Sequence, residues 1–160
     1  MQDQASIVAS LNSTWFASGL EPETQTRLAE LARTYHAEPG QELLREGDPS
    51  DLFGVVIRGR IALRTLVPER GEITILTIEP GDVFGWSTVV PPYRSTSTAV
   101  AIEPTDAIVF EAAGIRAALR TDCRLAVALY PRIMLAVSRR LNATRHQLLD
   151  LFAAEEVRSW

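Results

Sequence analysis

Glycine and proline residues divide the middle of the chain into short segments of similar length. Seven of the nine glycines and six of the nine prolines lie between Gly40 and Pro104. The resulting turn signals fall at Pro39-Gly40, Gly47-Asp48-Pro49, Arg58-Gly59, Arg70-Gly71 and Pro80-Gly81. A turn about every 8 to 12 residues is typical of antiparallel sandwiches, barrels and jelly rolls, and it leaves no room for βαβ units. This spacing constrains the fold more than any other feature and predicts an antiparallel β-structure.

The segments between the turns have the composition of β-strands. Apolar and polar residues alternate in Ile61–Leu66 and in Ile73–Ile78, as expected for strands with one buried face. The predicted strands are Glu42–Arg45, Leu52–Arg58, Arg60–Val67, Ile73–Ile78, Thr98–Ile102 and Ala107–Phe110.

Helical patterns occupy both ends of the chain. Glu21-Pro22-Glu23 opens a segment with Leu28, Leu31 and Ala32 at helical spacing, and Thr121-Asp122 offers an N-cap for a long helix near the C-terminus. The 160 residues suffice for one buried core and are too few for two ordinary domains. We therefore predict one α+β domain, mainly β, over residues 1–160. Its parts are N-terminal helices over about residues 5–36, an antiparallel β-roll or jelly roll over 38–111, and a short helix plus a long C-terminal dimerisation helix over 112–153.

The long helix carries apolar residues at alternating spacings of three and four, which is the a/d seam of a coiled coil. The seam comprises Val127, Tyr130, Met134, Val137, Leu141, Thr144, Leu148 and Leu151, of which Thr144 alone is a small polar residue. A second apolar face, with Leu125, Leu129, Ile133 and Ala136, is suited to pack onto the β-structure. Two apolar faces predict a homodimer through the seam; the alternative is that one chain buries both. Pro131 predicts either a kink or a new helix start.

Charge and composition limit the classes of binding partner and the cellular compartment that we expect. The net charge is −4, the pI is near 5.2 and all sixteen basic residues are Arg, which argues against a nucleic-acid-binding surface over the whole chain. A single Cys123 excludes an internal disulfide and fits a reducing compartment. Because no segment looks like a signal peptide or a membrane span, we expect a cytoplasmic protein with no membrane partner. The scattered His36, His146, Cys123 and Met134 have no metal-ligand spacing, so no metal site and no resident cofactor are predicted.

The order of helices, glycine-punctuated β-roll, short helix and long helix resembles the cyclic-nucleotide-binding domain of Crp/Fnr-type regulators. The similarity covers roughly Phe16 to Phe152. It rests on Gly19-Leu20, on Pro39-Gly40, Leu44 and Glu46-Gly47-Asp48 of the entry strand, on Gly59, on Pro80-Gly81-Asp82-Val83-Phe84-Gly85, and on Arg139-Arg140-Leu141-Asn142-Ala143-Thr144. The resemblance implies a non-enzymatic regulatory module.

In that family a phosphate-binding cassette reads Phe-Gly-Glu-(Leu/Ile)-Ala-Leu, and Pro-Arg with small or hydroxyl residues follows. The resemblance places Phe84 and Gly85 at the start of the cassette and makes Arg94, followed by Ser95, the phosphate-binding arginine. Charge-assisted donors from an arginine suit a phosphate. On the long helix, Thr144 matches a hydroxyl that contacts the base in some relatives, and Arg145 stands where a second hydroxyl would be.

The chain departs from the family at the glutamate that accepts from the ribose hydroxyl. Trp86 occupies that position, with Ser87 and Thr88 after it. An indole cannot accept a hydrogen bond, so the anion-binding half of the site is retained and the sugar-binding half is replaced. Small stand-alone proteins of this fold resemble the chain in having Phe-Gly-Trp-Ser and Pro-Pro-Tyr-Arg in the cassette. We predict that the site binds a small phosphate or other anion, or no ligand, and binds cyclic AMP or cyclic GMP only weakly.

Each of these residues has a structural alternative. In these alternatives, Arg94 would form an ion pair with an acidic neighbour, Trp86 would fill the core or an interface, and Thr144 would fix the register of the seam.

The sequence argues against two other function classes. A transcription regulator that responds to cyclic AMP or GMP acts on DNA only through a C-terminal domain, for which no room follows Phe152, so no direct DNA binding is expected. An enzyme on a jelly roll, such as a metal-dependent cupin, needs clustered histidines, whereas His36 stands alone at the edge of the β-region. The sequence names neither the ligand nor a protein partner.

Overall fold

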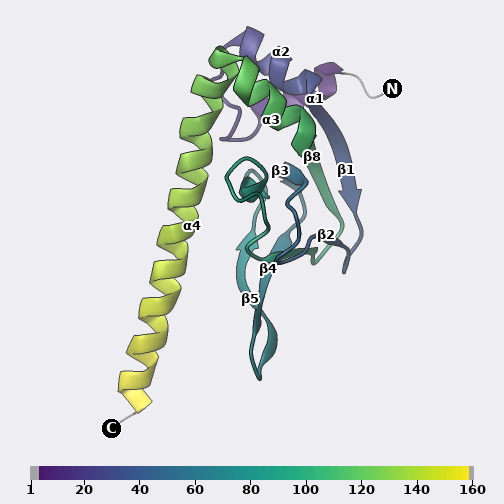
Figure 1. The fold of residues 1–160 in the computed structure, drawn as a ribbon. Helices are drawn as coiled ribbons and strands as arrows, with labels where there is room; N and C mark the ends of the chain where they lie inside the picture. Colours follow the sequence, from purple (N-terminus) through teal and green to yellow (C-terminus); the bar gives the residue numbers. More distant parts are fainter. Residues whose placement is uncertain (1–3, 159–160) are drawn as a thin grey trace.

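Two four-stranded antiparallel sheets form a roll that carries helices at one end, in a computed structural model that describes residues 4–158 and side chains through 154 (Figure 1). The first sheet has the order β1-β8-β3-β6, and the second has the order β2-β7-β4-β5. The strands are β1 Ala32–Ala37, β2 Glu42–Leu44, β3 Leu52–Arg58, β4 Ile61–Val67, β5 Gly71–Ile78, β6 Val83–Phe84, β7 Thr98–Ala101 and β8 Thr105–Glu111. The fold class predicted from the turn spacing is confirmed.

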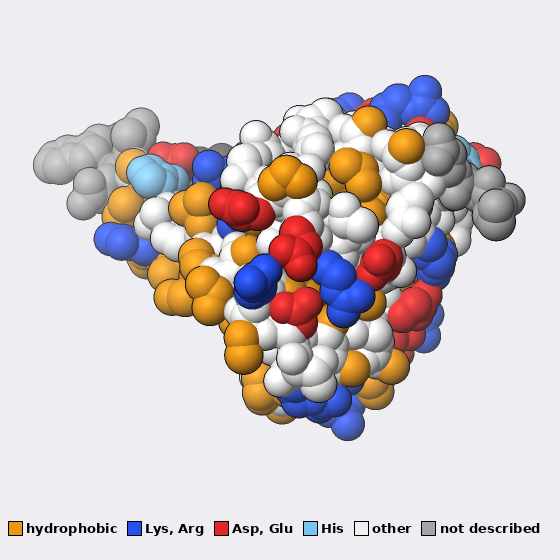
Figure 2. All heavy atoms as spheres, turned by 90° about the horizontal axis from the view of Figure 1, so that it is seen from above, with side chains coloured by type: hydrophobic (Ala, Val, Ile, Leu, Met, Phe, Trp, Pro, Cys, Tyr) orange, Lys and Arg blue, Asp and Glu red, His pale blue; other side chains and the backbone are white. Residues whose placement is uncertain are grey.

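The helices close one end of the roll, and the longest of them runs along its side. In Figure 1 the helices α1 Gln4–Asn12, α2 Pro22–Glu30 and α3 Ala112–Thr121 lie above the sheets, and α4 Cys123–Arg158 descends beside them. None of the described helices combines the length and apolar character that crossing a membrane requires. Seen from above, acidic and basic side chains alternate over this end (Figure 2), where Arg27 pairs with Glu30 and Asp122, and Arg124 pairs with Glu23.

Strand β8 separates two hydrophobic cores because neighbouring side chains of a strand point to opposite faces. Ile108 and Phe110 belong to the core between the first sheet and the helices, whereas Ala107 and Val109 belong to the core inside the roll. The same alternation holds in β3, where Phe53 contributes to the helical core. The interior of the roll is therefore apolar, and it supports the cassette from below.

The predicted N-terminal helical region is too long. Helix α2 ends at Glu30, and β1 occupies residues that we assigned to a helix. This strand pairs with β8 over its whole length, from Ala32 opposite Phe110 to Ala37 opposite Thr105. Long-range pairing with an edge of the first sheet overrides the weak helical spacing at Ala32. The two-residue strand β6 was also missed.

Helix α4 is continuous from Cys123 through Pro131. Its start is capped as expected, because the Asp122 carboxylate accepts a 3.0 Å hydrogen bond from the Leu125 N–H. The face predicted to pack on the body is buried in the helical core, as its members Leu125, Leu129, Ile133 and Ala136 show. The seam residues remain largely exposed in the single chain, with Val127 at 75% and Met134 at 70%. Figure 2 shows hydrophobic side chains on the flank that runs towards the C-terminal end of α4.

Candidate functional site

The cassette begins where β6 turns sharply out of the roll. Phe84 is fully buried in the inner core, and Gly85 then adopts a left-handed conformation with φ of 70°. A Cβ at Gly85 would collide with the backbone carbonyl of Leu52, so this turn accepts only glycine. A single 3-10 turn, Trp86–Thr88, follows. Phe84 thus supports the cassette from within the core.

A second segment, residues 93–98, returns past the loop between β2 and β3. The Ser95 N–H donates to the Asp48 carbonyl at 2.9 Å, and the Ser95 carbonyl accepts from the Gly47 N–H at 2.8 Å. The Tyr93 carbonyl accepts from the Ser50 N–H at 2.8 Å. These bonds, together with an antiparallel bridge between Pro49 and Arg94, hold the segment against the β2–β3 loop.

The two segments enclose a small cavity lined by hydroxyl groups. Its lining residues are Leu44, Ser50, Leu63, Gly85, Trp86, Ser87, Ser95, Thr96, Ser97, Ala99 and Arg140. Its volume is about 20 Å³, which is room for roughly one water-sized group. The Ser95 Oγ is buried and has no hydrogen-bond partner among the described residues. A buried hydroxyl without a partner is rare in folded proteins, so the cavity wall has an unused donor and acceptor.

Arg140 of α4 brings a positive charge to this cavity. Its guanidinium donates a 2.9 Å hydrogen bond to the Val83 carbonyl, just before the cassette. Burial lowers the pKa of Arg140, and the nearby Asp82 partly offsets this effect. Within the described part of the chain Arg140 has no ion-pair partner. Arg140 is thus a partly buried cation whose charge Asp82 stabilises only in part, and an anion in the cavity would stabilise it further.

Arg94, the predicted phosphate arginine, does not line this cavity. Its guanidinium donates to the Gly47 carbonyl at 2.7 Å and is exposed, and Arg94 is absent from the residues that line the cavity. The structure therefore places Ser95, and not Arg94, at the cavity. The alternative, an ion pair of Arg94, is also not found among the described side chains.

The other predicted site residues divide between the cavity and its surroundings. Trp86 and Ser87 line the cavity, and Trp86 also packs against the helical core. Thr88 is buried beneath it, with its hydroxyl 2.8 Å from that of Ser50. Thr144 donates to the Arg140 carbonyl within its own helix, and both Thr144 and Arg145 are exposed and away from the cavity lining in the single chain.

Arg116 of α3 was missed by the sequence analysis and holds the cassette in place. Its Nε donates to the Thr88 carbonyl at 2.6 Å, and its Nη2 donates to the Ser50 carbonyl at 2.9 Å. The guanidinium carbon lies 4.2 Å from the centre of the Tyr93 ring. One side chain thus joins the turn, the β2–β3 loop and the returning segment.

One feature of the sequence indicates that Arg140 lies against the body of the domain. The buried face of α4 follows Leu125, Leu129, Ile133 and Ala136, and Arg140 is the next position at that spacing. A polar residue that continues an apolar helix face lies against the body of the domain. Nothing comparable marks Arg116, whose contacts are 28 and 66 residues away in the chain.

The roll, the glycine turn and the buried cassette coincide with a known family pattern. Residues 35–122 match the family model described as the cyclic nucleotide-binding domain. The chain belongs to this family. The match includes the cassette and its supporting strands, so the altered Trp86 turn is a variation within a cyclic nucleotide-binding domain.

Similar proteins combine this domain with different activities. The chain is 36% identical over 96 residues to the acetyltransferase Pat of Mycolicibacterium smegmatis, covering 60% of this chain and 28% of that protein. It is 26% identical over 133 residues to a CRP-like cAMP-activated global transcriptional regulator of Mycobacterium tuberculosis, covering 83% of this chain and 58% of the regulator. A crystal structure of a cyclic nucleotide-binding domain from Methylobacillus flagellatus has a TM-score of 0.78 and 21% identity, covering 92% of this chain and 83% of that one. The last likeness shows the fold alone.

Proposed function

We propose that this chain is a non-enzymatic regulatory module that binds a small anion at its altered cassette and forms a homodimer through α4. The cavity lining contains hydroxyl groups and one guanidinium, and it contains no carboxylate, histidine or cysteine. A site without a general base or an activated nucleophile is suited to binding and not to catalysis.

The observation that carries this proposal is that one cavity has both an unused hydroxyl and a partly buried cation that forms no ion pair among the described residues. Ser95 Oγ lacks a partner, and Arg140 donates only to a backbone carbonyl. An oxyanion supplies acceptors for both groups and neutralises the buried charge. Inorganic phosphate, or a phosphate group on a small molecule, has this chemistry, and one of its oxygens fills the space of about one water-sized group that the cavity offers. Arg140 takes the role that the family resemblance gave to Arg94.

Cyclic nucleotides fit this site poorly. Trp86 offers no acceptor to a ribose hydroxyl, and a lost hydrogen bond to a charged group weakens binding by about ten- to a hundred-fold. We therefore expect phosphate to bind more tightly than cyclic AMP or cyclic GMP.

The exposed seam of α4 supports the homodimer. Leu141 and Leu151 are 61% and 66% exposed, in line with Val127 and Met134. A sustained stripe of large apolar side chains on one helix is the surface of a coiled-coil partner, and an identical chain offers the matching seam.

Calorimetry with inorganic phosphate and both cyclic nucleotides tests the proposal. Arg140→Gln and Ser95→Ala should each weaken phosphate binding, whereas Arg94→Gln, a matched loss of charge outside the cavity, should leave it unchanged. Trp86→Glu should strengthen cyclic AMP binding by restoring the acceptor. Micromolar binding of cyclic AMP by the wild-type chain, lost on Arg94→Ala, overturns the altered-cassette proposal.

That last result would favour a second candidate function. The alignment with the CRP-like cAMP-activated regulator extends over 83% of this chain, and it supports a module that responds to cyclic AMP within a transcription regulator. The two candidates differ in the arginine that they use, which is why Arg94 and Arg140 are the residues to compare.

A further inference from the structure

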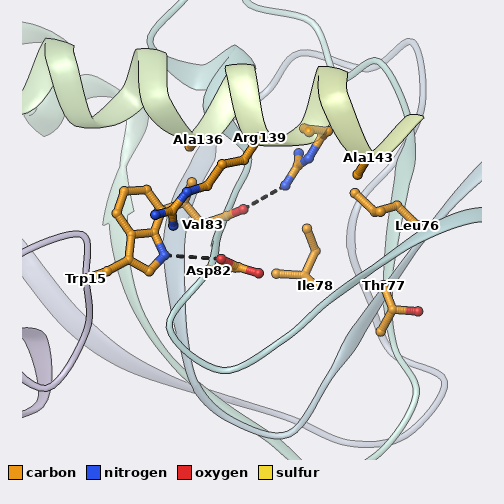
Figure 3. Close-up of a pocket in the computed structure, with 10 residues that line it drawn as sticks. Trp15, Leu76, Thr77, Ile78, Asp82, Val83, Ala136, Arg139 and Ala143 are labelled. Atoms are coloured by element: carbon orange, nitrogen blue, oxygen red, sulfur yellow. Dashed lines mark hydrogen bonds between the residues drawn. The ribbon is translucent and has the colours of Figure 1, made fainter. Parts of the chain in front are cut away.

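A groove outside the cassette separates α4 from the roll. Its volume is about 190 Å³, and its wall includes Trp15, Ile78, Asp82, Arg139, Arg140 and Ala143. These residues come from the N-terminal loop, from β5, from the turn before β6 and from α4, so the groove exists only in the folded domain (Figure 3). The proposed phosphate site uses none of them except Arg140, which lines both spaces.

The groove is positively charged, although the chain as a whole carries −4. Two guanidinium groups and one carboxylate line it. One oxygen of that carboxylate, Asp82 Oδ1, already accepts from Trp15 Nε1 at 3.1 Å. Neither Arg139 nor Arg140 forms an ion pair within the described residues. One negative charge is therefore missing from the wall.

Arg139 is held in an orientation that leaves its donors available. Figure 3 shows its guanidinium over the Trp15 ring, with the guanidinium carbon 4.3 Å from the ring centre. Trp15 is fixed in turn by Asp82 and by Arg132, which donates to the Trp15 carbonyl at 3.0 Å. A guanidinium stacked on an indole keeps the N–H groups along its edge free for a planar acceptor such as a carboxylate.

The remaining wall is mostly apolar. It consists of Leu76, Ile78, Val83, Ala136 and Ala143, with Thr77 as the one further polar residue of the lining. A dry cavity of about 150 Å³ admits benzene, so the groove has room for one ring or an aliphatic body of similar size.

We propose that this groove is a second ligand site, which binds a small organic carboxylate through Arg139 and Arg140. The carboxylate supplies the missing charge, and the apolar body of the ligand lies on Ile78 and Ala143. A short anion without an apolar body fills the cassette cavity better than this groove, so the two sites differ in the class of ligand that they take.

Benzoate is the probe for this site, titrated into the full chain and followed by calorimetry and by tryptophan fluorescence. We expect saturable binding that Arg139→Gln weakens about ten-fold or more and that Ala143→Phe, which fills the groove, abolishes. Arg145→Gln, the same charge loss at an exposed position of the same helix, should leave the affinity unchanged. Benzyl alcohol, which has a similar shape and no charge, should bind less tightly than benzoate; this comparison uses the wild-type protein and does not depend on the folding of a variant.

Two outcomes overturn the proposal: no saturable benzoate binding to the wild-type chain, or equal affinity in the wild type, Arg139→Gln and Ala143→Phe. Ser95→Ala separates this site from the cassette, because it should weaken phosphate binding without changing benzoate binding. A wild-type chain that binds benzoate but not phosphate counts against the proposed function and leaves the groove proposal standing.

Discussion

The Nε of Arg116 donates a 2.6 Å hydrogen bond to the carbonyl of Thr88, the last residue of the cassette turn. The same guanidinium donates to the Ser50 carbonyl and stacks on Tyr93, so α3 contacts three chain segments around the cassette cavity. The shape of the cassette thus depends on a residue that does not line the cavity.

Replacing this residue tests its contribution. Arg116→Ala should lower the free energy of unfolding by about 2–3 kcal/mol, because two carbonyls lose a charged donor and one aromatic ring loses its stacking partner. Urea denaturation measures the change. Arg120→Ala, an exposed arginine of the same helix, should change it by less than about 0.5 kcal/mol. Equal effects of the two substitutions would contradict a supporting role for Arg116.

Gly85 should tolerate no side chain. Gly85→Ala forces a Cβ against the Leu52 carbonyl, so we expect a loss of about 3 kcal/mol or more, together with a disturbed cassette. Gly40→Ala is the matched control, since Gly40 also has a positive φ of 87° but has no atom within 4 Å of the added Cβ. At Gly40 only the strain of the left-handed backbone should lower the stability, by about 1–2 kcal/mol. Thermal or urea unfolding of both variants gives the comparison, and similar losses would show that the steric argument fails.

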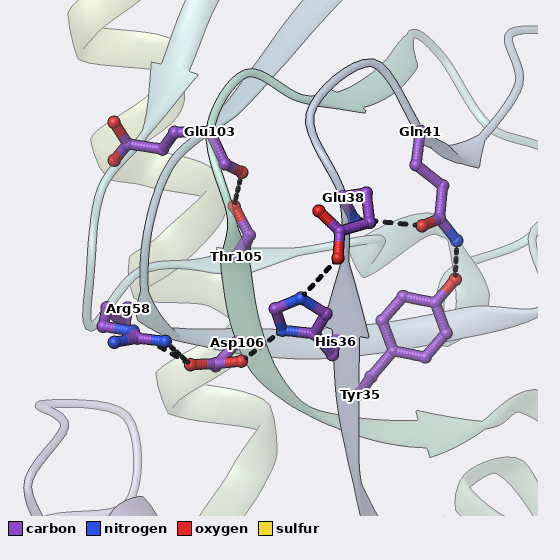
Figure 4. Close-up of polar contacts among 8 residues, drawn as sticks. All are labelled: Tyr35, His36, Glu38, Gln41, Arg58, Glu103, Thr105 and Asp106. Carbon is purple, nitrogen blue, oxygen red and sulfur yellow. Dashed lines mark hydrogen bonds and ion pairs between the residues drawn. The ribbon is translucent and has the colours of Figure 1, made fainter.

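His36 joins β1 to β8 through a cross-strand ionic contact. Its Nδ1 lies 2.6 Å from Asp106 Oδ1 and its Nε2 lies 3.2 Å from Glu38 Oε1, and Arg58 pairs with the same Asp106 (Figure 4). The hydrogen bond to Asp106, followed by the one to Glu38, raises the pKa of His36 above 6.5. The bond to His36 is also the largest influence that lowers the pKa of Asp106 below 3.8.

These shifts predict how stability depends on pH. Protonated His36 stabilises the fold fully below pH 6.5, and this contribution is lost as the pH rises through its higher folded-state pKa. Ionised Asp106 stabilises the fold above pH 3.8, and this contribution is lost as the pH falls through its lower folded-state pKa. The difference in unfolding free energy between the wild type and His36→Gln should therefore be largest near about pH 5.5 and shrink towards about pH 9. Urea denaturation at several pH values checks this. If the difference between the wild type and His36→Gln stays constant with pH, the ionic contact of His36 is not its cause.

The seam predicts the oligomeric state. Leu141→Asp places a charge in the centre of the proposed coiled coil and should convert dimers to monomers in sedimentation. Asn142→Asp adds the same charge next to the seam and should leave the dimer intact. A wild-type chain that is already monomeric at about 50 micromolar would contradict the dimer.

The roll was predictable because its information is local. Turn glycines and alternating strands fix where the segments begin and end, and β3 was predicted with its observed bounds Leu52–Arg58. Strand β1 was not predictable, since Arg33, Thr34 and Tyr35 form a strand only because β8, over seventy residues later, offers an edge. Pattern alone does not show such partners.

The cassette arginine shows a different limit. Motif position singled out Arg94, whereas the residues of this segment that line the cavity in the single chain are Ser95, Thr96 and Ser97, and Arg94 donates to the Gly47 carbonyl. The charge at the cavity comes instead from Arg140, because the buried face of α4 extends one position beyond Ala136. The sequence contained that signal in the helix and not in the motif.

The place of Arg140 on the border of two spaces has a thermodynamic consequence. One guanidinium cannot direct the same N–H groups into both spaces at once, so an anion in the cassette and a carboxylate in the groove would compete for it. By reciprocity, whatever factor phosphate imposes on carboxylate affinity, the carboxylate must impose on phosphate affinity. In this domain of 160 residues, the occupancy of each proposed site would then depend on the ratio of the two ligand concentrations and not on one ligand alone.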